Sequence, residues 1–380
     1  MRHFDLALIG FGAATMSLAV RLAPRYTGRI AIIEPRRLPT DDRTWCGWRL
    51  DHHPFVDRAT QVWTSWAVSR GDHEVVRSSA QTPYEMLRAS SVQQQALEAV
   101  ETRPDWDLFT ESALQTAQRR GSAWSLTLDS GETVTATRVM DSRPPSVALE
   151  RPWVWQSFVG RELRGPGLAG DSPVRLMDFT DDRAPLLTFV YELPIGPDHR
   201  LIELTRFAPQ RPDLSVMNED LDRLLARRGL ADHTVAREEA SHLPMAPIPA
   251  SNRADWMRVG TAGGSMRPAT GYAFHGIQRW ADACAEALVV GDTPPAPSRR
   301  PLMDWLDGVF LESLWRHQPS GTAGTPFVSL FEKAPPEAMT RFLMSRPRPA
   351  DIGHILRALP PIPMLKAALQ YSCRRRQGVR

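Results

Sequence analysis

The sequence contains very little cysteine: Cys46, Cys284 and Cys373 are the only ones among 380 residues. An odd number of widely separated cysteines is not the pattern of a disulfide framework or a zinc site, so we predict no metal site and a reducing compartment. Long apolar runs are also missing, because no stretch of 18 apolar residues occurs, and we expect no membrane-spanning helix. The N-terminus lacks the apolar segment and cleavage site of a signal peptide, which favours a cytoplasmic location.

Lysine is almost absent, and arginine supplies nearly all of the positive charge. The net charge is only +3, so we do not expect the chain as a whole to bind nucleic acid. The last residues, 373–380 (CRRRQGVR), are locally basic. We interpret them as a solvated basic tail, with contact to anionic lipid as the alternative.

The first 35 residues have the pattern of a βαβ unit. A buried strand pattern, FDLALIG, ends at Gly10, an amphipathic helix pattern opens at Ala13, and a second strand pattern ends at Glu34. Gly10 permits a tight turn, and Gly12 lets the backbone approach a pyrophosphate at the helix N-terminus. Glu34 stands where an acid accepts hydrogen bonds from ribose hydroxyls. The unit predicts nucleotide binding, although Thr15 occupies the place of the third glycine of the usual fingerprint.

The rest of the chain does not simply alternate strands and helices. Strand patterns occur at 58–68, 73–79, 122–128, 133–142, 174–179, 186–194 and 200–207, and helical patterns fill most of 218–228 and 270–372. A nucleotide-binding half interrupted by a β-rich region is the layout of FAD monooxygenase-type flavoproteins. We therefore predict an α/β fold: a Rossmann-like FAD-binding domain with an inserted antiparallel-sheet substrate domain and a C-terminal helical region. The predicted boundaries are 1–60, 84–150 and 250–295 for the FAD-binding domain, 61–83 and 151–249 for the substrate domain, 296–372 for the helical region, and 373–380 for the tail.

The stretch GTAGG, from Gly260 to Gly264, follows a strand pattern and has almost no side-chain bulk. In the predicted layout this late turn closes over the flavin, so we expect Gly260, Gly263 and Gly264 to let the cofactor lie against the backbone. Thr270 is the expected N-cap of the following helix, whose N-terminus points toward the flavin.

Several motifs together resemble those of the lycopene β-cyclases, a family of bacterial and plant flavoproteins. They are GFG…E, DDRTWCGW, YEMLR, DSRP, WQSFVGREL, VRLMDF, FVYELP, LIELT, LPMAPIP and GTAGGSMRPATGYAFHGIQ, and they span essentially the full chain. Two places depart from the family pattern. Ser91 and Val92 replace Asp-Phe, and Leu204 replaces the second acid of the acidic motif. These departures leave open a different polyprenyl substrate.

The resemblance implies cyclisation of the ψ end groups of lycopene, or of a related acyclic carotene, to β rings without net redox change. It also implies FAD that is active in its reduced form, with NAD(P)H as the reductant of the flavin. A proton adds to the terminal alkene, the next alkene attacks the resulting cation, and loss of a ring proton completes the ring. This chemistry needs an acid that stays protonated, a dry apolar pocket and an electron-rich group beside the cation.

Glu203 is the predicted acid. It stands in the strand pattern RLIELTRF at the position of the family's acidic motif, and strand alternation places Leu201, Glu203 and Thr205 on one face. A carboxyl in an apolar pocket has a raised pKa and stays protonated near neutrality. The alternative is a surface glutamate paired with an arginine such as Arg206.

Three further charged residues fall in matching motifs. Asp178 is expected to position groups near the acid or to stabilise the cation, with a structural ion pair as the alternative. Glu162 is expected to have a structural or gating role, and Arg43 to contact the phosphates of the cofactor or to fix its loop. Aromatic faces that can stabilise a cation, or simply pack in the core, are those of Trp45, Trp48, Trp155, Phe158, Tyr191 and, near the flavin, Tyr272.

A carotene lives in a bilayer, so the resemblance also implies a protein docked at the inner face of the membrane. Leu, Phe and Trp in the C-terminal helical patterns favour such a surface, with a lid of ordinary core helices as the alternative. Two other functions remain open: an FAD oxidoreductase that consumes NAD(P)H, and an isoprenoid-binding protein without turnover.

Overall fold

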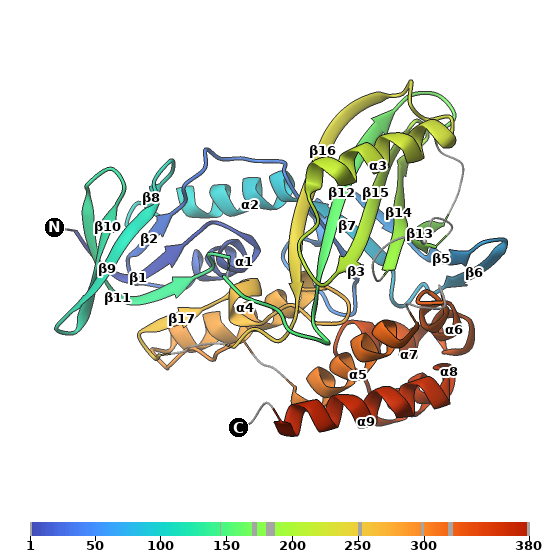
Figure 1. Ribbon diagram of the computed structural model, residues 1–380. Coiled ribbons are helices and arrows are strands. Elements are labelled where there is room, and N and C mark those ends of the chain that lie inside the picture. The colour runs from blue at the N-terminus through green and yellow to red at the C-terminus, as the bar shows by residue number, and fades with distance from the viewer. Residues whose placement is uncertain are drawn as a thin grey trace.

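The computed structural model describes residues 2–144, 146–168, 173–179, 187–249, 253–297, 300–317 and 322–377. Figure 1 shows two large sheets standing side by side, with the helices of the C-terminal third packed beneath the second sheet. The predicted fold class is confirmed. The predicted domain boundaries stay predictions.

The first sheet is built on the βαβ unit and carries the nucleotide-binding turn. Its strand order is β8-β2-β1-β11-β10-β9, with β17 beside β11, and β1 runs parallel to both β2 and β11. The strands are β1 His3–Ile9, β2 Ile30–Ile33, β8 Asp107–Phe109, β9 Leu114–Arg120, β10 Ala123–Leu128, β11 Thr133–Asp141 and β17 Trp256–Arg258. Helices α1 Ala13–Leu22, α2 Ala89–Glu101 and α4 Phe274–Val289 share one apolar core with the buried residues of β1 and β2.

The second sheet has the strand order β16-β12-β15-β14-β13-β5-β6. Its strands are β5 Ser65–Arg70, β6 His73–Ser78, β12 Val154–Arg164, β13 Val174–Asp178, β14 Leu187–Gly196, β15 His199–Ala208 and β16 Thr234–Met245. Alternation along β15 explains the two faces of the sheet: Ile202 and Leu204 pack against helix α3 (Leu214–Arg227), and Leu201 and Phe207 join the opposite core. The strands predicted at 73–79, 174–179, 186–194 and 200–207 are confirmed as β6, β13, β14 and β15. The single strand predicted at 58–68 is instead divided between β5 and a strand of another sheet, and the sequence patterns indicated neither β12 nor β16.

A small sheet and the C-terminal helices complete the molecule. The strands β3 Thr44–Trp48, β7 Tyr84–Arg88 and β4 Gln61–Trp63 form the small sheet, and short 3-10 helices lie at Val56–Arg58 (η1) and Gly260–Gly263 (η2). The C-terminal helices are α5 Pro301–His317, α6 Thr325–Lys333, α7 Pro336–Leu343, α8 Pro349–Ala358 and α9 Pro361–Gln377. Residues 373–377 of the predicted tail are the last residues of α9, and 378–380 lie outside the described residues. In the described part of the chain, no helix is long and apolar enough to cross a bilayer.

Candidate active site

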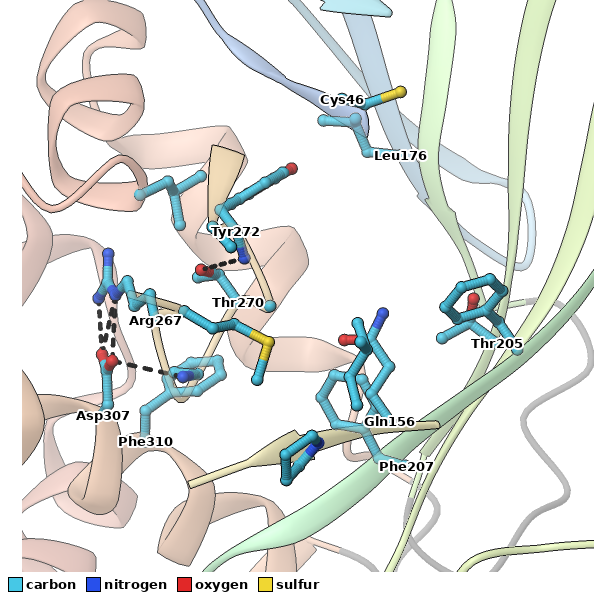
Figure 2. A pocket seen from close by; sticks show the side chains of 18 of the residues that line it. Cys46, Gln156, Leu176, Thr205, Phe207, Arg267, Thr270, Tyr272, Asp307 and Phe310 are labelled. Atoms are coloured by element: carbon cyan, nitrogen blue, oxygen red, sulfur yellow. Dashed lines mark hydrogen bonds and ion pairs between the residues drawn. The ribbon is translucent and has the colours of Figure 1, made fainter. Parts of the chain in front are cut away.

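A cavity of about 990 Å³ lies between the nucleotide-binding turn of the first sheet, the second sheet and the C-terminal helices. Its lining includes the start of α1, the strands β12, β14, β15 and β16 of the second sheet, and helices α5 to α9. Figure 2 shows Thr205 and Phe207 of the second sheet on one side of the cavity, and Asp307 and Phe310 of α5 on the other. The cavity therefore joins a nucleotide-binding turn to a mostly apolar chamber.

The turn before α1 has the features of a pyrophosphate site. A Cβ built on Gly12 meets no atom of the described chain within 4 Å, and Gly12, Ala13 and Ala14 line the cavity. Gly12 is the N-cap, and among the described side chains none caps α1, so the first amide groups of the helix remain available to an anion. Thr15, in the place of the missing third glycine, donates from Oγ1 to the Gly10 carbonyl at 2.7 Å.

Gly10 and Glu34 hold this turn in its conformation. Gly10 has φ +84°, and a Cβ there would lie 2.5 Å from the Ser142 hydroxyl oxygen, so only glycine fits. The buried Glu34 carboxylate accepts hydrogen bonds from the Phe11 amide at 2.7 Å and from the Arg36 Nε at 2.7 Å. This places an acid at the end of β2, as predicted from the sequence, and fixes it against the glycine turn.

The glycines of the late turn, Gly260 to Gly264, have different roles: one lines the cavity and the others allow close packing or a left-handed backbone. Gly260 lines the cavity, and a Cβ there would lie 3.2 Å from that of Ala14 on α1. Gly263 packs against backbone, because a Cβ there would lie 2.3 Å from the Arg258 carbonyl oxygen. Gly264 is left-handed, with φ +84°, and ends η2. Gly260 thus touches the space that a cofactor can occupy, and the other two glycines shape the turn.

The expectation that Thr270 caps the following helix is wrong. Helix α4 begins at Phe274 with Ala273 as its N-cap, because Gly271, at φ +73°, holds the chain in a turn for several residues more. Thr270 lines the cavity, and its hydroxyl accepts a hydrogen bond from the Tyr272 amide at 3.4 Å. Arg43 also lines the cavity, with its guanidinium half-exposed and 3.4 Å from Asp42.

A buried ion pair joins the late turn to the C-terminal helices. The Arg267 guanidinium contacts the Asp307 carboxylate of α5 at 2.7 and 3.0 Å, and both side chains are buried. Arg267 also donates to the Phe342 carbonyl at the end of α7, and Asp307 accepts from the Ala269 amide at 3.3 Å. Figure 2 shows this pair at the edge of the cavity. The arrangement fixes the helical wall relative to the glycine turn.

Glu203 lies on the sheet wall of the cavity, as predicted, with a second glutamate nearby. Glu203 of β15 and Glu239 of β16 are both cross-strand partners of Gly160 on β12, so the three residues form a row on one face of the sheet. Both glutamates line the cavity and are buried. A Cβ built on Gly160 would lie 3.4 Å from the Glu203 Cγ and 3.3 Å from the Glu239 Cγ, so the two side chains flank the glycine closely.

The two glutamates have different partners. Glu239 accepts hydrogen bonds from Arg237 Nη1 at 2.9 Å and from the Thr44 hydroxyl at 2.8 Å, whereas Glu203 accepts one from the Thr205 hydroxyl at 2.8 Å. Burial, and then the charge of Glu239, raises the pKa of Glu203 to about 8. Burial also raises the pKa of Glu239, although Arg237 opposes that rise. Burial and the neighbouring charge therefore favour the protonated form of Glu203, whereas the Arg237 guanidinium favours the charged form of Glu239.

Phenol and thiol groups line the cavity next to Glu203. The Tyr84 hydroxyl lies 2.9 Å from that of Tyr191 and 3.5 Å from that of Tyr272. Cys46 hydrogen-bonds with Tyr191, and burial raises the pKa of the thiol and of the three phenols, so these groups are neutral. The aromatic residues singled out from the sequence all line the cavity: Trp45, Trp48, Trp155, Phe158, Tyr191 and Tyr272.

Asp178 and Glu162 lie in ion-pair networks, and neither lines the cavity. Asp178 pairs across strands with Val190, which packs against α3, so it lies on the face of the sheet opposite Glu203. Asp178 accepts from Arg228 Nη2 at 2.7 Å and from the Ser69 hydroxyl at 3.1 Å. Glu162 is buried and contacts Arg88, His199 and Arg237. Because Arg237 also binds Glu239, the Glu162 network holds the second glutamate in place. These contacts favour structural or positioning roles, and the predicted catalytic role of Asp178 stays a prediction.

His53, Glu85 and His275 form a buried cluster next to strand β7, and their possible metal-ligand atoms lie within 4.8 Å of one another. His53 Nε2 lies 2.7 Å from Glu85 Oε1, and Arg49 lies 3.1 Å from the other carboxylate oxygen. Two ligands of one zinc ion, each about 2.0–2.2 Å from the metal, stand more than 2.7 Å apart in tetrahedral geometry. The contact is therefore a direct hydrogen bond, which ties β7 to the segment after β3.

Solved structures that share this fold include a reductase-like protein and a probable FAD-dependent monooxygenase. A geranylgeranyl bacteriochlorophyll reductase-like protein from Thermoplasma acidophilum has a TM-score of 0.66 at 14% identity, covering 98% of this chain and 100% of its own. A probable FAD-dependent monooxygenase from Pseudomonas aeruginosa has a TM-score of 0.59 at 15% identity, covering 94% of this chain and 100% of its own. At these identities the likeness defines the fold class alone.

Sequence comparison defines the family. The model of the family described as lycopene cyclase protein matches residues 5–369, so the chain belongs to the lycopene cyclase family and is an enzyme of the carotenoid cyclase type. A lycopene beta-cyclase from Pantoea ananas is 26% identical over 97% of this chain and 97% of its own length. The resemblance inferred from the motifs is confirmed.

Proposed function

We propose that this chain closes the ψ end groups of lycopene, or of a related acyclic carotene, into β rings, with Glu203 as the proton donor. The observation that carries the proposal is a buried carboxyl with a raised pKa on the wall of a largely apolar cavity. Its proton adds to the terminal alkene, and the next alkene attacks the tertiary cation to form the ring carbon–carbon bond. Loss of a ring proton then forms the double bond, so atoms and electrons balance without a redox partner.

The walls around Glu203 suit a cation intermediate. The lining of the cavity is mostly apolar, and aromatic faces such as those of Trp48 and Tyr191 stabilise positive charge nearby. The neutral phenols and the neutral Cys46 thiol add dipoles to the cavity wall, and none of them is a base that would remove the proton of Glu203. When bound, reduced FAD supplies a negative π-system for the same purpose.

The nucleotide end of the cavity fits FAD. Gly12 and Ala13 offer open space and free amide groups for a pyrophosphate, Gly260 lies against the same space, and Arg43 supplies a positive charge. Glu34 stands at the end of β2, at the place of a ribose partner. NAD(P)H, as the reductant that prepares the flavin, is part of the same proposal.

Gly12→Val tests the cofactor site. The backbone of Gly12, at φ −94°, accepts an ordinary side chain, and a Cβ there meets no atom of the described chain, so the variant is expected to fold. Its methyl groups occupy the space assigned to the pyrophosphate, and we expect the purified protein to lose most of its flavin. The measurement is flavin per polypeptide together with the melting curve of the cofactor-free protein. Full flavin content in Gly12→Val contradicts the assignment.

The reaction itself is tested anaerobically with lycopene in liposomes and with FAD either oxidised or chemically reduced. We expect products of unchanged mass and blue-shifted absorption, formed only with reduced flavin. Oxidation of NAD(P)H in proportion to product would indicate an oxidoreductase instead. Tight binding of the polyene without turnover would indicate a carrier.

Activity is expected to fall as the pH rises through about 8. Glu203 acts in its protonated form, and its raised pKa keeps that form populated below about pH 8, so the active fraction is lost above this value. The measurement is kcat at saturating lycopene across acidic, neutral and alkaline pH, with flavin content and circular dichroism followed at each pH. A decline centred near the ordinary pKa of glutamate would contradict Glu203 as the acid.

The mouth of the cavity favours a membrane as the source of substrate. Leu356 of α8 and Leu365 of α9 line the cavity and are nevertheless 55% and 63% exposed, so the cavity reaches the surface between these helices. Ile362 and Leu369 continue the exposed stripe along α9 at helical spacing. Helix α9 contains no acidic residue and ends in Arg374, Arg375 and Arg376, which suits an anionic lipid surface.

The double variant Ile362→Gln/Leu369→Gln tests this surface, because neither residue lines the cavity formed by the described residues. We expect vesicles of phosphatidylcholine and phosphatidylglycerol to bind it about tenfold or more weakly, since two exposed apolar side chains are lost. Activity on lycopene in detergent micelles is expected to stay near that of the unchanged protein. Val216→Gln/Val235→Gln, at exposed positions on α3 and β16, is the matched control. Equal binding by both double variants contradicts the assignment.

A further inference from the structure

We propose that Glu203 and Glu239 hold one proton between them across Gly160, and that Glu239 is the base that receives the proton lost from the ring. This inference rests on the proposed function and adds a second catalytic residue to it. Its basis is geometric: two buried carboxyls flank the same glycine on the wall of the cavity.

Gly160 is what lets the two carboxyls approach each other. Residues two strands apart in a sheet are separated by about 9.6 Å between their Cα atoms, and an intervening side chain normally fills that space. Gly160 has no side chain, and the two glutamates move into that space: their Cγ atoms lie within 3.4 Å of where a Cβ would stand. A substrate ring lying over Gly160 therefore has one carboxyl on each side.

The surrounding charges leave one proton for the pair near neutral pH. The groups facing it are Tyr191 of β14 and Cys46 of β3, which are neutral, and Arg237 and Glu162, which are paired with each other. Arg237 also contacts Glu239 directly at 2.9 Å. Two neighbouring carboxyl groups in so buried a site do not both lose their protons easily. Because Arg237 stabilises the charged form of Glu239, the one proton stays on Glu203.

The proposed sequence of steps uses both carboxyls. The Glu203 O–H bond breaks as its proton forms a C–H bond at the terminal alkene, and the ring carbon–carbon bond follows. A ring C–H bond then breaks, its electrons form the ring double bond, and its proton goes to the Glu239 carboxylate. Transfer of that proton from Glu239 to Glu203, directly or through water, restores the starting state. The protonated carbon and the deprotonated carbon belong to the same small ring, which suits an acid and a base on adjacent strands.

Glu239→Gln tests the pair. The amide keeps an acceptor for the Thr44 hydroxyl but removes the charge and the base, so we expect kcat to fall by about 10²-fold with little change in KM. Loss of the negative neighbour lowers the pKa of Glu203, so the alkaline decline of kcat should move to lower pH. Glu238→Gln, whose side chain is exposed and pairs with Arg161, is the matched control and should leave both properties unchanged.

An infrared titration of the substrate-free protein separates this inference from the proposed function. The absorption of protonated carboxyl groups should show a group that titrates near pH 8 and is lost in Glu203→Gln. In Glu239→Gln and in Gly160→Ala, which wedges a methyl group between the glutamates, the titration should move. An unmoved titration, or an unchanged kcat in Glu239→Gln, overturns the shared proton or the base, respectively. A coupled titration in a protein that leaves lycopene unconverted would keep the shared proton and reject both the proposed reaction and the role of Glu239 as its base.

Discussion

Glu203→Gln is expected to abolish cyclisation, with a loss of about 10³-fold or more in kcat, because the amide cannot donate the initiating proton. The amide has nearly the same size as the carboxyl and still accepts the hydrogen bond of the Thr205 hydroxyl. The protein should therefore retain its fold and its flavin. Product formed per flavin under reducing, anaerobic conditions is the measurement.

The same assay on Glu192→Gln supplies a comparison on the neighbouring strand. Glu192 is buried on β14, but its carboxylate is taken up by Arg200 and Arg228 on the other face of the sheet. Loss of activity restricted to Glu203→Gln would identify the acid. Activity in Glu203→Gln within a few fold of the unchanged protein would remove Glu203 from that role.

Asp307→Asn is expected to be the most destabilising of these changes, at about 3–5 kcal/mol, because it leaves the buried Arg267 charge without its carboxylate. The midpoint of urea unfolding, read by circular dichroism, measures the loss. Glu74→Gln makes the same chemical change in the largely exposed pair with Arg175 and should cost about 1 kcal/mol or less. Similar losses in the two variants would show that the buried pair contributes no more than a surface pair.

The nucleotide half and the strand carrying Glu203 could be predicted because their signals are local. Gly10 and Glu34 follow short buried strands and Gly12 precedes a helix, and the alternation around Glu203 places it on one face whatever the neighbouring strands are. The family motifs supplied the rest of the prediction, including the late glycine turn. Burial of Glu203 on the cavity wall agrees with that interpretation.

Glu239 and the start of α4 could not be predicted, because both depend on contacts between distant segments. The segment around Glu239 is rich in charge and resembles a solvent-exposed stretch, yet pairing with β12 turns Glu239 inward beside Gly160. The late start of α4 follows from the left-handed turn at Gly271, which places Tyr272 against Tyr84. A cross-strand glycine between two possible acids is the signal that a search for Glu239 would need.

The form of the cavity has a kinetic consequence for a substrate with two equivalent ends. The proposed acid, Glu203, is on the sheet wall, and the opening to the surface lies between α8 and α9, so we expect a long hydrocarbon substrate to present one end at a time. Under the proposed function, the product with one ring has to leave the cavity, reverse and re-enter before the second ring can form. We therefore expect distributive catalysis. The ratio of monocyclic to bicyclic product would follow the supply of fresh substrate in the bilayer rather than any difference between two active sites.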